Sequence, residues 1–279
     1  MLSIFFGLMS ALVWGSADFA GGLASRRSSA FRVVLIAEVI GLFILVTVVV
    51  LLKEPFFGWV SWLWCASAGA IGSLGLVLLY RALAEGKMSL AVPVSALMAA
   101  LLPAVVGSFI EGIPGWPTFV GFGLALVAIW FISKPPAGAV QAGFNLAGLW
   151  LPMLAGVGFG LYFILIHQGN QSSVIWPLVS SRSGGSLILL LFLFASRQDW
   201  KPGRAAMPLI FLNAILDIGG NTFYILSDQF GRMDVAAVIS SLYPAATIGL
   251  AWLVLKERIV STQWIGIVSA LAALLFISL

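Results

Sequence analysis

Apolar residues occur along this chain in long continuous runs that are separated by short polar connections. Each run is about 20 residues long, which is the length that a helix needs to cross a bilayer at ~1.5 Å per residue. No run shows the ten-residue alternation of apolar and polar positions that membrane β-barrels require, so we expect helices. The ten segments predicted to span a membrane are Ser3–Ala24, Phe31–Leu52, Trp59–Ala82, Met88–Ile110, Trp116–Ser133, Leu146–His167, Val174–Ala195, Ala205–Ser227, Met233–Leu255 and Thr262–Leu279.

The order of these helices repeats once along the chain. Gly86-Lys87-Met88 matches Gly231-Arg232-Met233, and the same offset of 145 residues pairs Ser95 with Ser240 and Gly121 with Gly266. Chance similarity between Leu/Ala/Gly-rich helices is the alternative explanation. Because a five-helix repeat has an odd number of crossings, its second copy enters the bilayer upside down. The predicted fold is therefore an all-α membrane protein of ten transmembrane helices, with inverted repeats at residues 1–133 and 146–279 and a linker at 134–145.

The composition supports lipid as the solvent of this chain. Hydrophobic residues make up 61% and charged residues 9% of the 279 residues, against ~45–50% and ~25% in globular chains. The single cysteine lies inside an apolar run, so we expect no disulfide and no metal site. The first run contains Asp18 and lacks a basic segment before it, so we interpret it as a retained helix rather than a secretory signal.

Basic residues are distributed unequally between the two sets of connections. Eleven lie in or beside odd-numbered connections and two in even-numbered ones. Because Lys and Arg concentrate in cytoplasmic loops, this count places both termini outside the cytoplasm. The scattered basic residues fit cytoplasmic loops better than a nucleic-acid-binding surface. The last span reaches the final residue, Leu279, which is compatible with truncation of a longer natural chain.

Four ionisable residues stand well inside the predicted spans, where a charge is costly and typical of a functional site. Counted at ~1.5 Å per residue from the nearest basic helix end, Asp18 and Glu38 lie roughly 12 and 9 Å deep. By the same count Arg182 and Asp217 lie roughly 22 and 20 Å deep. We therefore expect an Arg182–Asp217 pair, either as a structural ion pair or as a substrate contact. Asp18 and Glu38, at the shallower depth, have no expected basic partner. We expect them either to bind a substrate amine or to carry a proton. The alternative for Glu38 is that its side chain reaches the membrane interface.

Polar residues also form a stripe on one predicted helix. Asn213, Asp217 and Asn221 recur at intervals of four, which places them on one helix face. Such a stripe either bonds neighbouring helices or lines a water-filled path. The candidate substrate-binding residues are Trp14, Asp18, Glu38, Tyr162, Arg182, Asn213, Asp217, Asn221 and Tyr243. The candidate kink or gating residues are Pro93, Pro103 and Pro244, because proline frees backbone carbonyls and bends helices.

Several segments resemble the EamA family of the drug/metabolite transporter superfamily. The resemblance covers both repeats, and the segments that carry it are Trp14-Gly15-Ser16, Val92-Pro93-Val94-Ser95-Ala96-Leu97, Ile239 to Thr247, Leu255-Lys256-Glu257-Arg258 and Gln263 to Gly266. The family implies ten helices, a central cavity between the repeats and alternating access. Members often carry a basic residue in helices two and seven; Arg182 fits the latter, whereas Glu38 stands at the former. Many members keep their termini in the cytoplasm, contrary to the count of basic residues here.

The resemblance implies a secondary transporter, an exporter of small polar metabolites such as amino acids, in a bacterial inner membrane. Its expected partners are a small-molecule substrate and the lipid bilayer, and coupling to protons is left open. We expect a monomer, no cofactor, no metal and no nucleic acid. The alternatives are an exchanger of phosphorylated or nucleotide-linked metabolites, or a non-transporting membrane enzyme or structural protein. An enzyme is disfavoured because Ser183 and His167 are accompanied by neither a GxSxG nor an HExxH motif.

Overall fold

The computed structural model describes residues 1–84, 88–132, 150–170, 173–196, 201–255 and 261–278, and these are helical with short connections and no strand. The helices are α1 (Leu2–Ser25), α2 (Ala30–Leu52), α3 (Trp59–Ala84), α4 (Met88–Ile110), α5 (Trp116–Ile132), α6 (Trp150–Gly169), α7 (Ile175–Ser196), the 3₁₀ turn η2 (Arg204–Ala206), α8 (Met207–Gln229), α9 (Met233–Ser240), α10 (Tyr243–Leu255) and α11 (Ser261–Ser278). Each segment predicted to be helical has its counterpart among them. The predicted linker at 134–145 lies outside the described residues.

The predicted span Met233–Leu255 consists of two helices, α9 and α10, and the break between them lies beside the candidate kink residue Pro244. The chain leaves helical hydrogen bonding after Ser240 and re-enters it at Tyr243, with the Leu242 N–H donating to the Ile239 carbonyl at 3.1 Å. Pro244 occupies the first turn of α10, where a missing N–H costs nothing because it has no helical acceptor. In contrast, α4 continues through Pro93 and Pro103.

The bundle exposes large apolar side chains and buries charged ones, which is the reverse of a water-soluble protein. Large apolar side chains such as Phe43, Phe109 and Phe194 are more than 70% exposed, at 75%, 87% and 76%, whereas charged residues such as Glu38 and Arg182 are buried. Seven helices are long and apolar enough to cross a membrane, and three further helices of the searched residues are apolar but shorter, namely Val94–Ile110, Trp116–Phe131 and Ser261–Ile277. The chain is an integral membrane protein whose outer surface suits lipid.

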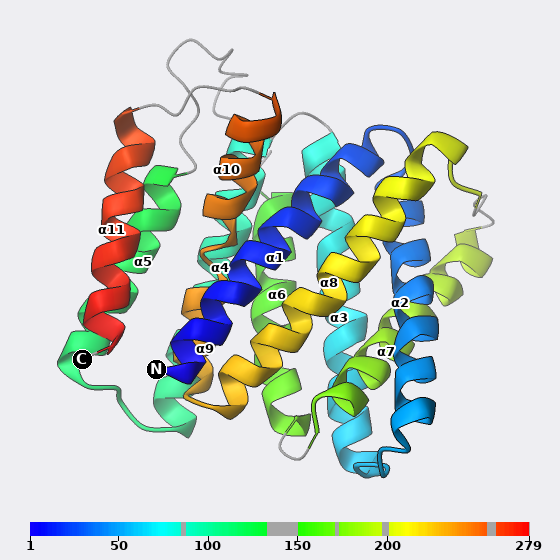
Figure 1. The fold of residues 1–279 in the computed structure, drawn as a ribbon, viewed down its shortest axis with the longest axis horizontal. Coiled ribbons are helices and arrows are strands. Elements are labelled where there is room, and N and C mark those ends of the chain that lie inside the picture. Colours follow the sequence, from blue (N-terminus) through cyan, green and yellow to red (C-terminus); the bar gives the residue numbers. More distant parts are fainter. Residues whose placement is uncertain (85–87, 133–149, 171–172, 197–200, 256–260, 279) are drawn as a thin grey trace.

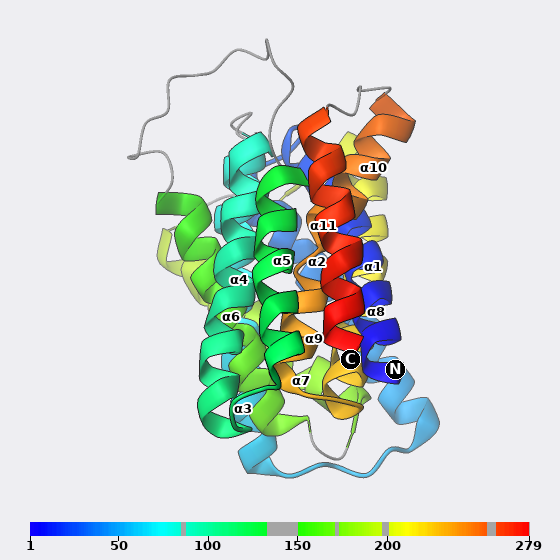
Figure 2. The same ribbon diagram turned by 90° about the vertical axis from the view of Figure 1, so that its left-hand side faces the viewer.

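The helix pairings join the two halves of the chain. The closest pairs are α1 with α8 and α3 with α6, and α5 packs beside α11 at one edge of the molecule (Figures 1 and 2). Helices α2 and α7 also pack together, as do α4 and α9. Exchanging the two halves turns α1·α8 into α6·α3 and leaves α5·α11 and α2·α7 unchanged. The pattern of contacts is therefore the one that a two-fold relation between the halves would produce.

The first helices of the two halves run in opposite directions. Helix α1 begins beside the end of α8, where the Ser227 hydroxyl donates to the Ser3 carbonyl at 2.7 Å. Helix α6 ends at the same place, since His167 contacts Asp228 near the end of α8. Figure 1 shows both chain termini at this end of the bundle, which we call the termini end.

Candidate functional site

A small cavity lies inside the bundle between the two halves of the chain. Its volume is about 80 Å³, enough for a few water molecules but far below the ~300–1,000 Å³ of typical metabolite pockets. Residues from both halves line it: Trp14, Asp18, Glu38, Gly69, Gly72, Ser73, Leu76, Ala99, Phe159, Tyr162, Phe163, Ser181, Arg182, Asp217, Asn221 and Tyr243. Of the nine candidate binding residues from the sequence, the structure brings eight to this cavity.

Arg182 on α7 holds the charged part of the cavity wall together. Its Nη1 donates to Glu38 Oε1 at 2.9 Å, and its Nη2 donates to Asp217 Oδ2. All three side chains are largely withdrawn from solvent. In a low-dielectric interior such charge-assisted hydrogen bonds are strong, and removing the guanidinium would leave two carboxylates facing each other.

The sequence-based placement of Glu38 is therefore wrong. We expected Glu38 to share a level with Asp18 and to have no basic partner, yet it forms an ion pair with Arg182. Ser73 on α3 adds a second hydrogen bond by donating from its hydroxyl to Glu38 Oε1 at 2.9 Å. The error has a geometric cause: depths counted along straight helix axes ignore helix tilt and the reach of two long side chains, each several ångströms.

The residues of this cluster are related by one spacing along the chain. An offset of 144 residues relates Glu38 to Arg182 and Ser73 to Asp217. Within each half the two partners are bonded to each other: Ser73 to Glu38, and Asp217 to Arg182. The polar centre of the protein is thus a quartet in which the first half supplies an acid and a hydroxyl and the second half supplies a base and an acid.

Two glycines at the same offset allow this close approach. Gly41 lies one turn beyond Glu38, and Gly185 lies one turn beyond Arg182. A methyl group at Gly41 would lie 3.2 Å from Arg182 Nε, and one at Gly185 would lie 3.0 Å from Glu38 Oε2. Each charged side chain therefore packs over the glycine of the opposite helix, as reciprocal contacts across a two-fold axis do.

Asp18 on α1 is the cavity carboxylate that the guanidinium does not reach. It is 8% exposed, and its neighbours are the Tyr80 hydroxyl and Asp217. The Asn213 amide donates to the Tyr80 hydroxyl oxygen at 2.8 Å, which leaves the Tyr80 proton free to point at Asp18. Among the residues that the structure describes, Asp18 forms no ion pair with a basic side chain.

The residues of the predicted polar stripe on α8 have two different roles. Asn221 lines the cavity and accepts a hydrogen bond of 2.5 Å from the Tyr162 hydroxyl, while its amide donates to the Asp217 carbonyl at 2.6 Å. Asn213 lies away from the cavity and donates to the Ala17 carbonyl at 2.9 Å. Asn213 therefore fastens α8 to α1 and supports Tyr80, rather than facing the cavity.

Aromatic side chains form much of the remaining wall. Trp14 lies 5.7 Å from Phe163 and 5.7 Å from Tyr224, measured between ring centroids, and Phe163 stacks on Tyr224 at 4.5 Å. On the opposite wall the Tyr243 hydroxyl is 3.1 Å from Ser95 Oγ. These contacts lock the rings that face the cavity, so its apolar surface is preformed.

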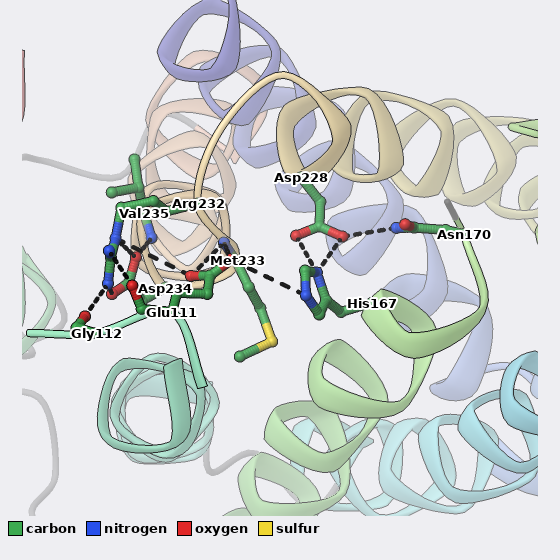
Figure 3. A network of polar contacts seen from close by, with 9 residues as sticks. All are labelled: Glu111, Gly112, His167, Asn170, Asp228, Arg232, Met233, Asp234 and Val235. Carbon is green, nitrogen blue, oxygen red and sulfur yellow. Dashed lines mark hydrogen bonds and ion pairs between the residues drawn. The ribbon is translucent and has the colours of Figure 1, made fainter. Parts of the chain in front are cut away.

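A second polar network lies at the termini end of the bundle (Figure 3). His167 Nδ1 contacts both carboxylate oxygens of Asp228, at 2.9 and 3.0 Å, and the Asn170 amide donates to the same carboxylate at 2.6 Å. His167 is four residues beyond Phe163, and Asp228 is four beyond Tyr224. The network therefore lies about one helical turn, ~6 Å, from the aromatic cluster.

The same network continues into the first half of the chain. Glu111 accepts a hydrogen bond from the Met233 N–H at 3.1 Å, at the N-terminus of α9, where an anion is favourable. Arg232 pairs with Asp234 at 2.7 Å and donates to the Gly112 carbonyl at 2.7 Å. The hydrogen bonds that Arg232 donates to the Asp234 carboxylate raise the pKa of Arg232 above its ordinary value, so this link stays charged. The contacts connect the ends of α4, α6 and α8 with the start of α9.

Sequence reasoning missed several residues of the site. Ser73, Ser181 and the aromatic rings of Phe159 and Phe163 line the cavity but carry no pattern distinct from their helices. The signal that could have found Ser73 is its equivalence to Asp217 at an offset of 144 residues. No group of three His, Cys, Asp or Glu residues is arranged to hold a metal within the described ranges.

Comparisons with known proteins agree with this architecture. A protein of known crystal structure superposes with a TM-score of 0.75 and 14% identity, covering 98% of this chain and 95% of its own. An uncharacterized protein of Haemophilus influenzae is 25% identical over 171 residues, which are 56% of this chain and 54% of that protein. The chain thus matches about half the length of this relative. The EamA-like transporter family matches residues 1–134 and again residues 146–279. The chain belongs to the EamA-like transporter family.

Proposed function

We propose that this protein is a secondary transporter, an exporter of small polar metabolites such as amino acids, and that it works by alternating access through the central cavity. The observation that carries the proposal is a set of four charged side chains, buried Asp18, Glu38 and Arg182 and partly buried Asp217, around a cavity lined by both halves. Charges inside a membrane are costly and are retained where a solute or ion passes.

We further propose that the two halves, residues 1–133 and 146–279, are inverted repeats that together cross the membrane ten times. The opposite directions of α1 and α6 and the exchange symmetry of the helix pairs support this relation. The substrate cavity then lies at the repeat interface, as in other inverted-repeat transporters. We expect a monomer to be sufficient, because one chain supplies both walls, and we place it in a bacterial inner membrane.

Alternating access requires the cavity to open, since its present volume holds only a few waters. On the termini end, the aromatic cluster of Trp14, Phe163 and Tyr224 and the network around Asp228 stand between the cavity and the outside. We infer that these contacts break when the cavity opens on that side. The break between α9 and α10 beside Pro244 provides a place where the chain can bend.

The charge of the cavity disfavours the alternative substrate class of phosphorylated or nucleotide-linked metabolites. Three carboxylates and one guanidinium line it, and both Nη atoms of Arg182 are already bonded to Glu38 and Asp217. An anionic substrate would have to displace one of these carboxylates and would be repelled by the others. We therefore propose that Arg182 organises the wall as a structural ion pair, the first of the two roles expected for it, rather than contacting the substrate.

Counterflow in proteoliposomes tests the transport proposal. Vesicles containing the purified protein are loaded with a mixed panel of unlabelled amino acids, amines and sugar phosphates, and uptake of each labelled solute is measured. We expect labelled solute to accumulate transiently for at least one amine or amino acid and not in protein-free vesicles. Flat time courses for the whole panel, with protein shown to be inserted, would contradict the proposal.

A further inference from the structure

The charges around the cavity do not balance, and the imbalance is located at one residue. Arg182 is shared by Glu38 and Asp217, which form the two ion pairs of the wall. Asp18 lines the same cavity and is 8% exposed, and within the described ranges its polar neighbours are the Tyr80 and Tyr243 hydroxyls and the like charge of Asp217. A buried carboxylate in this position is neutralised either by a proton or by a positively charged partner.

Aromatic rings line the same cavity as this carboxylate. Trp14 precedes Asp18 by one turn of α1, and Phe159, Tyr162 and Phe163 line the cavity from α6. Trp14 and Phe163 lie 5.7 Å apart and Tyr162 and Phe163 lie 5.9 Å apart, measured between ring centroids. Aromatic faces attract ammonium ions and also accept their apolar carbon groups. The rings and the carboxylate together have the chemistry of an ammonium site.

The groups that would recognise other ligands are already engaged. A substrate carboxylate needs a cationic donor, and Arg182 donates from both Nη atoms to acids of the wall. The Asn221 carbonyl oxygen and amide are bonded to Tyr162 and to the Asp217 carbonyl. Among the charged groups that line the cavity, the Asp18 carboxylate is therefore the one without an oppositely charged side chain beside it in the described parts of the chain.

We propose that the cavity binds an organic monocation, a primary or quaternary ammonium, whose charged nitrogen lies at Asp18 and whose carbon groups lie against Trp14, Tyr162 and Phe163. This inference rests on the proposed transport function and narrows its substrate class. A simple amine is favoured over the corresponding amino acid, because the added carboxylate would meet Glu38 and Asp217 rather than a free cation.

Equilibrium binding to the purified full chain in detergent tests the site with matched probes. Butylamine is compared with norvaline, which is the same amine with a carboxylate on the first carbon. Choline is compared with 3,3-dimethyl-1-butanol, its uncharged isostere. We expect at least one of the two cations to bind about 30-fold or more tightly than its matched probe, because the pairing with Asp18 takes place away from water.

Variants connect the binding to the residues. Asp18→Asn should weaken binding of the cation by about 30-fold or more, whereas Asp18→Glu should retain most of it. Glu54→Gln is the control, since Glu54 binds Ser173 outside the cavity and the variant should bind as the wild type does. If Asp18→Asn does not fold, Trp14→Leu provides the second test, with an expected loss of about tenfold for choline.

The outcomes separate this inference from the transport proposal. Binding of norvaline or of the uncharged isostere as tight as that of the cations would overturn the ammonium site, as would unchanged cation binding in a folded Asp18→Asn variant. Counterflow of amino acids together with absent cation binding would overturn the site and leave transport standing. Cation binding without any counterflow would support the site and overturn transport.

Discussion

At the scale of single residues, the protein depends on a few buried charges that satisfy one another across its two halves. Arg182 is bonded to one acid from the first half and one from the second, and Ser73 completes the set on the Glu38 side. Breaking a buried ion pair by removing one partner costs about 3–5 kcal/mol, because the remaining charge stays uncompensated. These residues therefore contribute to folding as well as to the chemistry of the cavity.

The proposed two-fold relation between the halves, which would place Glu38 opposite Arg182 and Ser73 opposite Asp217, leads to a prediction. Arg182→Glu alone places three acids together and should destabilise the protein by about 3–5 kcal/mol. The fourfold exchange Glu38→Arg, Ser73→Asp, Arg182→Glu and Asp217→Ser moves each side chain to its equivalent position and should recover most of that loss. Thermal unfolding in detergent measures both, with Glu54→Gln as the control. A fourfold variant no more stable than Arg182→Glu would contradict the two-fold relation.

At the scale of helices, the apolar runs of the sequence predicted the elements well. The expected segment Phe31–Leu52 corresponds to Ala30–Leu52, and the expected Met88–Ile110 has the same bounds in the structure. Such agreement has a simple cause: within lipid, backbone groups must bond inside the helix, so the length of an apolar run defines the element. The break at Ser241 and Leu242 lies beside Pro244, which the sequence indicated as a kink residue, whereas α4 continues through Pro93 and Pro103, which were indicated in the same way.

The sequence indicated the charged residues that line the cavity, but not all of the pairs that they form. Charged residues within apolar runs identified Asp18, Glu38, Arg182 and Asp217, and each of them lines the cavity. Their partners depend on helix tilt and on which faces cross, neither of which a single sequence specifies. For that reason the Glu38–Arg182 pair was missed, and Asn213 was placed in the cavity although it bonds to Ala17 and Tyr80 behind it.

At the scale of the whole molecule, the distribution of basic residues favours one orientation. Both termini lie at one end of the bundle, and Lys53 and Arg232 are the described basic residues of connections at that end. The opposite end carries six described ones, Arg26, Arg27, Arg32, Arg81, Lys201 and Arg204. Because basic loops stay in the cytoplasm, we propose that the termini lie outside it.

Reporter fusions test this orientation. A C-terminal fluorescent protein should stay dark, and a C-terminal alkaline phosphatase should be active, because the first folds in the cytoplasm and the second outside it. Fusions placed after Leu255, before the last helix, should give the reverse pattern and serve as the control. A fluorescent C-terminal fusion with an inactive phosphatase would place the termini in the cytoplasm.

The central claim is that substrate passes through the cavity between the halves, and the reactivity of a thiol in its wall tests that claim most directly. Ser181 lines the cavity and is 9% exposed, and the chain's single cysteine, Cys65, is replaced by alanine to give a silent background. In proteoliposomes, a membrane-impermeant thiol reagent should react with the Ser181→Cys variant. A transported solute should slow this reaction. Counterflow should fall in proportion to the fraction of protein that is labelled. Full labelling with counterflow unchanged, or a thiol that never reacts from either side while transport proceeds, would contradict passage through this cavity.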